Sequence, residues 1–219
     1  MIKESFSIYN RYLIQIMLLS VIIIIPLSII CYFGMVYLMQ ELDQSQYANL
    51  YALFLIIVNF TLVIPVFRRM AENDLQDEEE STLMDLIYEF AKHFGFIIMI
   101  TIPVYIAGVL GSVLLFIPTI MALLIILLVP FFVDYKKIKD IFRQVGRVLL
   151  KENISLLFDF VIIISLHVLV WGLMMMSLSN FENSVIVFGF ARSLVNALIF
   201  PILIFYLTQR YRSVALTTA

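Results

Sequence analysis

Three ionisable side chains, Asp159, His167 and Arg192, lie inside long apolar stretches of this sequence. A charged side chain at the centre of a membrane helix costs at least roughly 2.5–3.5 kcal/mol, so each of the three is expected to face protein, water or a partner. Asp159 is the only one that resembles a catalytic acid, and the apolar stretches hold no second carboxylate to work with it. Acid–base catalysis inside a membrane is therefore not indicated.

His167 and Arg192 predict one shared polar site. The apolar stretches that carry them are joined by a short segment, so the two helices should be neighbours, and the two residues fall at the same depth. Together with Ser193 and Asn196 they predict a ligand-binding site for an anionic group or a lipid headgroup. The alternative is that Arg192 extends to the membrane surface and His167 hydrogen-bonds a backbone carbonyl.

A run of acidic residues is the second candidate site. It contains Asp77, Glu78, Glu79 and Glu80, is preceded by Glu72 and Asp74, and is followed by Asp85. Such a surface can dock a basic partner, for example a cytoplasmic ATPase. The alternative is a solvated linker over 68–81, which is what most charge runs are.

Metal, cofactor and nucleic-acid chemistry are not indicated. The sequence has one cysteine and two histidines, and the histidines fall on different predicted elements. No sequence motif of a hydrolase, a zinc protease or a phosphate-binding loop occurs. The net charge of −2 does not suit nucleic acid. We expect a protein that is not an enzyme and has no metal or cofactor.

The composition indicates that the solvent of this chain is a lipid bilayer. Hydrophobic residues make up 63% of the 219 and charged residues only 14%. Residues 94–133 include no Asp, Glu, Lys or Arg. A membrane helix needs roughly 20 apolar residues, so this run is long enough for two passes. The predicted fold class is all-α, a polytopic membrane helical bundle forming a single domain over 1–219.

Six spans are predicted, at 12–39, 50–67, 94–116, 118–133, 154–176 and 185–207. The boundary between the third and fourth rests on Pro118, because proline lacks the donor that continues a helix and pushes its predecessor out of helical geometry. Small residues spaced four apart at 107–112 permit close helix contact and predict packing within the bundle.

The basic residues predict the orientation. Thirteen of the fourteen lysines and arginines fall on one side of these spans, and the fourteenth is Arg192. By the positive-inside rule, both termini are expected to be cytoplasmic. We expect the membrane to be the cell membrane.

Three amphipathic stretches, at 2–11, 82–93 and 138–150, each precede an apolar hairpin. Thr82 and Asp85 form a capping-box pattern that starts the second one. Helices of this kind lie in the membrane interface. The repeated order predicts three helix-plus-hairpin units, and the alternative is that all interfacial helices share one binary pattern.

Residues 81–157 resemble a group of bacterial membrane proteins related to the membrane domain of glycerophosphodiester phosphodiesterases. The likeness is carried by the segment from Gly111 to Pro118, by Pro130 in its span end, and by the amphipathic stretch after it. The group usually has glycine where this chain has Thr119. The resemblance implies the same topology and carries over no catalytic residue, because the phosphodiesterase catalytic domain is absent.

The chain is also similar to the permease subunits of type 2 ABC exporters. Those have six spans, cytoplasmic termini, an N-terminal interfacial helix and a coupling helix between spans two and three. The stretch from Glu80 to Ile87 is similar to the segment near that coupling helix. This resemblance implies a cytoplasmic ATPase as partner and a homodimer.

Two functions are consistent with these observations. The first is a non-catalytic accessory, scaffold, immunity or envelope protein that acts through membrane lipids or another membrane subunit. The second is the permease subunit of an ABC-type exporter of lipid or amphipathic peptide. The small number of polar residues within the spans favours the first.

Overall fold

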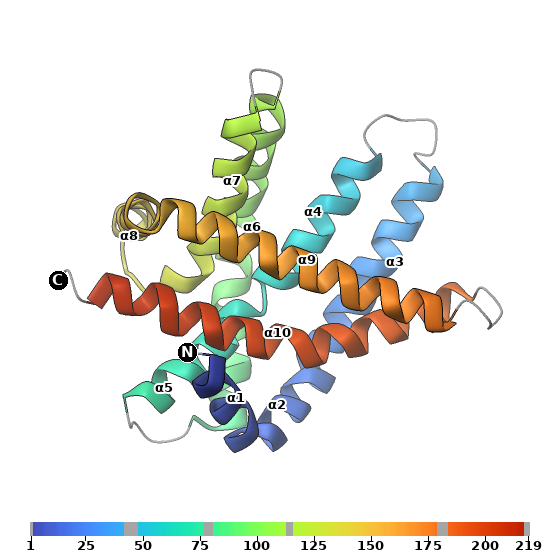
Figure 1. Cartoon of the computed structure of the whole chain (residues 1–219), viewed down its shortest axis with the longest axis horizontal. Coiled ribbons are helices and arrows are strands. Elements are labelled where there is room, and N and C mark those ends of the chain that lie inside the picture. The colour runs from blue at the N-terminus through green and yellow to red at the C-terminus, as the bar shows by residue number, and fades with distance from the viewer. Residues whose placement is uncertain (1, 42–47, 77–80, 113–115, 179–183, 217–219) are drawn as a thin grey trace. The chain divides into compact units, whose positions relative to one another are not determined.

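The structure is a computed structural model that describes residues 2–41, 48–76, 81–112, 116–178 and 184–216 (Figure 1). Over these ranges the chain is helical and contains no strand, which confirms the all-α prediction. The helices are α1 (Ile2–Arg11), α2 (Leu13–Leu19), α3 (Ile25–Glu41), α4 (Ala48–Thr61), α5 (Ile64–Leu75), α6 (Leu83–Gly111), α7 (Phe116–Leu128), α8 (Ile138–Lys151), α9 (Asn153–Leu178) and α10 (Val185–Leu216).

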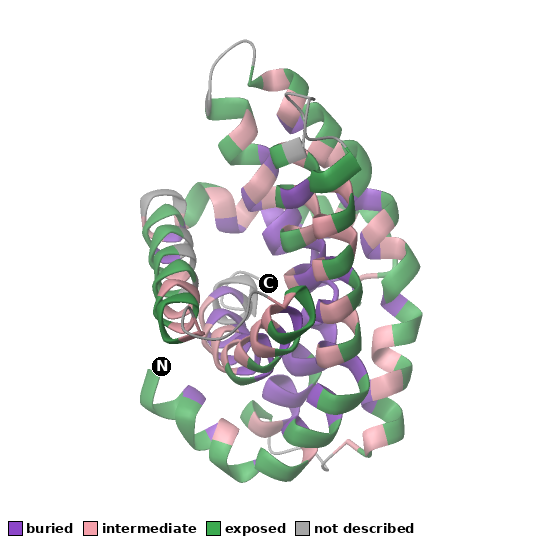
Figure 2. Ribbon diagram, turned by 90° about the vertical axis from the view of Figure 1, so that its right-hand side faces the viewer, coloured by how far each residue is buried: buried purple, intermediate pink, exposed green. Residues whose placement is uncertain are grey.

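Within the described ranges, five helical stretches are long and apolar enough to cross a membrane. They are Leu13–Glu41, Asn49–Leu75, Leu83–Gly111, Ser155–Leu178 and Val185–Tyr211. The fourth predicted span corresponds to a shorter apolar helix, Ile117–Phe132. Many large apolar side chains on these helices are exposed, which suits contact with lipid tails (Figure 2). The chain is a multi-pass membrane protein.

The chain divides into two compact units within the single membrane domain predicted from the sequence. The first, which we call the Arg68 unit, comprises Phe60–Asn153 and Ile204–Ala219, with Met1. The second, the Arg192 unit, comprises Ile2–Asn59 and Ile154–Leu203. The first and third predicted hairpins therefore contribute to one unit and the second hairpin to the other, so the units do not follow the three predicted repeats.

In the Arg192 unit, a π-helical turn at Ser20–Ile24 connects α2 to α3. The N–H of Ile25 bonds the carbonyl of Ser20, five residues earlier. Pro26 comes directly after it, and a proline ring clashes with the carbonyl four residues before it. A wider turn at this point accommodates the ring without breaking the helix.

In the Arg68 unit, α6 and α7 form a close hairpin, as the small residues predicted. A Cβ atom at Gly108 would lie 2.6 Å from the Cβ of Ala122, so only glycine permits this approach. Thr119 donates to the carbonyl of Gly108 at 2.8 Å. The turn falls earlier than expected, because α6 ends at Gly111 and α7 begins at Phe116. Pro118 lies in the first turn of α7. The N–H groups of a first turn have no partner within the helix, so proline loses no hydrogen bond there.

The predicted linker at 68–81 is helical over its first part. The helix α5 runs to Leu75, and it buries Arg68, Glu72 and Asn73. The first part of this segment is therefore not a solvated linker. Its charged residues are typical of an exposed segment, but Arg68 and Glu72 are buried and lie 3.9 Å apart.

Two of the three predicted amphipathic stretches, at 82–93 and 138–150, lie in this unit. Thr82 caps α6, with its side chain accepting from the Asp85 N–H and its own N–H donating to Asp85, so the capping box is confirmed. The stretch at 82–93 is continuous with the span after it, in one helix of 29 residues. The stretch at 138–150 is the separate helix α8.

Candidate functional site

A hydrogen-bonded link joins three helices of the Arg192 unit. The Asn196 amide on α10 donates to the Ser28 hydroxyl on α3 at 3.0 Å, and Ser28 donates to Asn59 Oδ1 on α4 at 3.2 Å. All three side chains are buried. Buried polar groups in an apolar setting are costly unless paired, so this link fixes which faces of the three helices meet.

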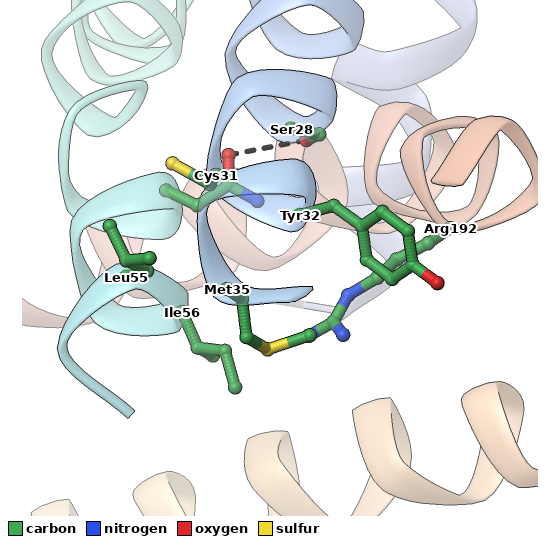
Figure 3. Close-up of a pocket in the computed structure, with 8 residues that line it drawn as sticks. Ser28, Cys31, Tyr32, Met35, Leu55, Ile56 and Arg192 are labelled. Atoms are coloured by element: carbon green, nitrogen blue, oxygen red, sulfur yellow. Dashed lines mark hydrogen bonds between the residues drawn. The ribbon is translucent and has the colours of Figure 1, made fainter. Parts of the chain in front are cut away.

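A pocket adjoins this link, with Ser28 and Asn59 in its lining, and extends one helical turn along α3 and α10 (Figure 3). Tyr32 follows Ser28 by four residues, and Arg192 precedes Asn196 by four, so each lies one turn along its own helix. Gly189 allows the close approach of α10 to α3, because a Cβ there would lie 2.8 Å from the Tyr32 ring. The space inside is small, about 10 Å³, close to what one water molecule requires. The pocket is lined by Ser28, Cys31, Tyr32, Met35, Leu55, Ile56, Asn59 and Arg192.

Arg192 is the only charged residue of this pocket lining, and it is half-buried. Its guanidinium carbon lies 5.0 Å from the centroid of the Trp171 ring on α9 and 6.0 Å from that of Tyr32. No carboxylate of the described residues lies within ion-pair distance of it. Aromatic rings attract a cation through their faces and accept none of the in-plane N–H donors. Those donors can therefore bind a planar or tetrahedral anion.

The four residues predicted for this site have different outcomes. Arg192 lines the pocket, and Asn196 anchors its base. Ser193 is buried and donates to the Phe190 carbonyl of its own helix, so it is not part of the pocket. The side chain of His167 lies outside the part of the chain that the structure describes, and its backbone is in α9.

Sequence reasoning missed the aromatic residues and the serine at this site. Trp171 is the only tryptophan of the chain and lies four residues after His167, so it occupies the next turn of the same helix. Its place one turn after His167 could have indicated that it belongs to the same site. Tyr32 and Ser28 lie in an apolar run and gave none, because their importance depends on which helices become neighbours.

A second polar centre lies in the Arg68 unit. Arg68 is only 1% exposed. It donates to the Phe131 carbonyl at 3.1 Å, to Asp134 at 2.8 Å and to Glu89 at 3.2 Å. Its Nε lies 3.9 Å from Glu72.

These contacts join three segments, namely α5, α6 and the 3₁₀ turn at Val129–Phe132 that ends α7. The Phe131 carbonyl is one of those that a helix end leaves without an internal partner. Glu89 is shared, because His93 Nε2 lies 3.0 Å and Lys92 Nζ 3.8 Å from its carboxylate. Each charge here has a partner of opposite sign, so the cluster can hold the unit together but offers no guanidinium to a ligand.

The predicted docking acids are only partly described. Asp77, Glu78, Glu79 and Glu80 lie outside the described residues. Asp85 is exposed and takes part in the cap of α6, accepting from Thr82. The carboxylate of Asp85 is thus committed to the helix start.

No family model, curated protein or solved structure matches this chain. The resemblances to the phosphodiesterase membrane domain and to the exporter permeases are neither supported nor excluded.

Proposed function

We propose that this is a non-catalytic accessory protein of the membrane that acts through the surrounding lipid, and that Arg192 binds the anionic headgroup of a membrane lipid. The observation that carries the proposal is the guanidinium of Arg192, held between Trp171 and Tyr32 with no carboxylate among the described residues to neutralise it. An uncompensated charge at membrane depth favours a ligand of opposite sign.

The phosphate of a phospholipid suits this arrangement. A guanidinium offers parallel N–H donors that match two phosphate oxygens, and such charged hydrogen bonds are about twice as strong as neutral ones. The pocket itself holds only about one water, so the lipid would lie at its open side. There the exposed Ile56 and the half-exposed Met35 suit the glycerol and upper acyl region. Free inorganic phosphate shares the headgroup chemistry but would leave these apolar contacts unused.

The orientation is part of the proposal. With the basic loops in the cytoplasm, both termini are cytoplasmic and the protein lies in the cell membrane. Arg192 follows the start of α10 at Val185 by about two turns, so the bound headgroup would belong to the outer leaflet.

The test is lipid retention by the full-length protein, purified in mild detergent and weighed by native mass spectrometry. Wild type should carry an anionic phospholipid, and Arg192→Gln should retain about tenfold less, since hydrogen bonds to a charged group contribute about 1.5–3 kcal/mol. Arg69→Gln, which removes an exposed arginine of the other unit, is the matched control and should retain the wild-type amount.

Other outcomes would distinguish a lipid headgroup from free phosphate, and an accessory protein from a permease. Displacement of the lipid by inorganic phosphate would show that the site recognises phosphate alone. Equal retention by wild type and Arg192→Gln would refute the site. Recovery of a stoichiometric ATPase in the same purification, lost when the acids at 77–80 are neutralised, would favour the permease alternative instead.

A further inference from the structure

The helix α8 and the two residues before it carry the densest group of bases in the chain. Six of the fourteen lysines and arginines fall within 136–151: Lys136, Lys137, Lys139, Arg143, Arg147 and Lys151. The segment and its immediate neighbours hold three acids, Asp134, Asp140 and Glu152. Bases therefore outnumber acids around this helix.

Two of those acids are already paired with other arginines. Asp134 accepts from the buried Arg68, and Glu152 lies 3.5 Å from Arg210. Among the described residues, neither Lys139 nor Arg143 has a carboxylate within ion-pair distance. Lys139 and Arg143 are therefore not neutralised by the described residues of the Arg68 unit.

The packing of α8 fixes which way these bases point. Ile141, Val145 and Val148 are at most 1% exposed, and they form the row that packs into the Arg68 unit. The helix α8 packs mainly against α7 and the 3₁₀ turn at Val129–Phe132. Because this row is buried, the helix cannot roll about its axis, and the positions of its other rows are fixed as well.

An exposed apolar row lies between the buried row and the bases. It consists of Ile138 and Phe142, which are four residues apart and 49% and 39% exposed. The exposed bases Lys139 and Arg143 follow each of them by one position, so they form a parallel row about 100° further round the helix. Lys151 falls on the side of α8 roughly opposite Ile138 and Phe142.

We propose that α8 lies on the bilayer with Ile138 and Phe142 inserted below the headgroups, and that Lys139 and Arg143 bind anionic phospholipid there. An apolar row flanked by bases is the arrangement that lets a helix bury its apolar side at the acyl boundary and contact phosphates at its edge. A lysine or arginine near an anionic surface contributes a preference of roughly fivefold for anionic lipid. This site is in a different unit from Arg192 and does not depend on it.

The test uses lipid-specific quenching in nanodiscs. The full-length Trp171→Phe, Phe142→Trp variant has one indole, placed in the apolar row of α8. Nanodiscs contain phosphatidylcholine with phosphatidylglycerol as the minor component, and either the first or the second lipid is brominated on its acyl chains. Quenching per brominated lipid should be at least about twofold greater for phosphatidylglycerol, and salt should reduce the difference.

Matched charge changes locate the effect on the helix. Lys139→Gln in the same background should lower the phosphatidylglycerol preference, whereas Lys151→Gln removes the same charge from the opposite side and should leave it unchanged. Equal preference for the two lipids in the parent variant, or equal loss in both charge variants, would overturn the proposal. An indole quenched by neither lipid would place α8 away from the bilayer, against another partner, and would overturn it as well. Retained helical circular dichroism excludes misfolding as the cause of a negative result.

Discussion

Arg68 and Arg192 lie in different units of one chain, and both guanidiniums are removed from bulk water. Arg68 has carboxylates at three positions and a backbone carbonyl within reach of its nitrogens. Arg192 has two aromatic rings and, among the described residues, no carboxylate. The first arrangement leaves nothing to bind, and the second leaves the donors of the guanidinium available. The difference between the two arginines is therefore whether carboxylates of the protein pair with the guanidinium. Arg68 has such partners and suits a structural role, whereas Arg192 has none among the described residues and suits a ligand.

Removing each guanidinium in turn should produce the largest difference between the two units. Arg68→Met should lower the free energy of unfolding by about 3–5 kcal/mol, because it leaves buried carboxylates without their cation. Arg192→Met should change it by less than about 1 kcal/mol. Thermal unfolding in detergent, followed by circular dichroism, measures both. Equal destabilisation by the two variants would show that Arg192 is structural as well.

A second test compares two carboxylates that contact Arg68. Glu89 is 15% exposed in its side chain and also faces His93 and Lys92, so Glu89→Gln should cost about 1.5–3 kcal/mol. The Asp134 side chain is 38% exposed, and water can replace it, so Asp134→Asn should cost less than about 1 kcal/mol. The reverse order in the same unfolding measurement would mean that burial does not decide the strength of these pairs.

The hydrogen-bonded link of the Arg192 unit is expected to contribute less to the free energy of unfolding than the ionic cluster around Arg68. Ser28→Ala removes the hydroxyl between Asn196 and Asn59, and the loss should be about 1–2 kcal/mol. Lipid retention should fall together with stability, because the link holds Tyr32 and Arg192 one turn away. Ser177→Ala, which removes an exposed serine bonded only within its own helix, is the control. Unchanged retention in Ser28→Ala would show that the pocket does not need this link.

The smallest effect concerns the ring beside Arg192. Trp171→Leu removes a cation–π contact of about 0.5–2 kcal/mol, and Trp171→Phe keeps most of it. Bound lipid should therefore decrease in the order wild type, Trp171→Phe, Trp171→Leu. Trp171 is the only tryptophan, so its fluorescence reports this site alone, and Arg192→Gln should shift its emission. An emission spectrum unaffected by Arg192→Gln would contradict the contact.

Features set by local sequence could be predicted. The long apolar runs indicated the spans, Thr82 and Asp85 indicated the start of α6, and the periodicity of 138–150 indicated α8. Each of these depends on residues within one or two helical turns. The predicted break between α6 and α7 falls too late, because Pro118 is a first-turn residue of α7 and not a helix breaker.

Features set by distant residues could not be predicted. Arg68 meets Glu89 21 residues later and Asp134 66 residues later. From the sequence alone, Arg68 was placed in a linker over 68–81 and Glu89 on the polar face of the amphipathic stretch at 82–93, so their contact was not expected. In the Arg192 unit, Ser28 and Asn196 are 168 residues apart, and nothing local shows that they meet. Arg192 itself could be identified, because charge within an apolar run is costly wherever its partners lie.

Chain synthesis imposes an order in time on the Arg68 cluster. At roughly 5–20 residues per second, Glu89 emerges about 1–4 s after Arg68, since 21 residues separate them. Asp134 follows Arg68 by 66 residues, or about 3–13 s. Between the emergence of Glu89 and that of Asp134, Arg68 has only Glu72 and Glu89 as carboxylate partners from this cluster. The guanidinium is therefore expected to stay near water or phosphate until Asp134 emerges.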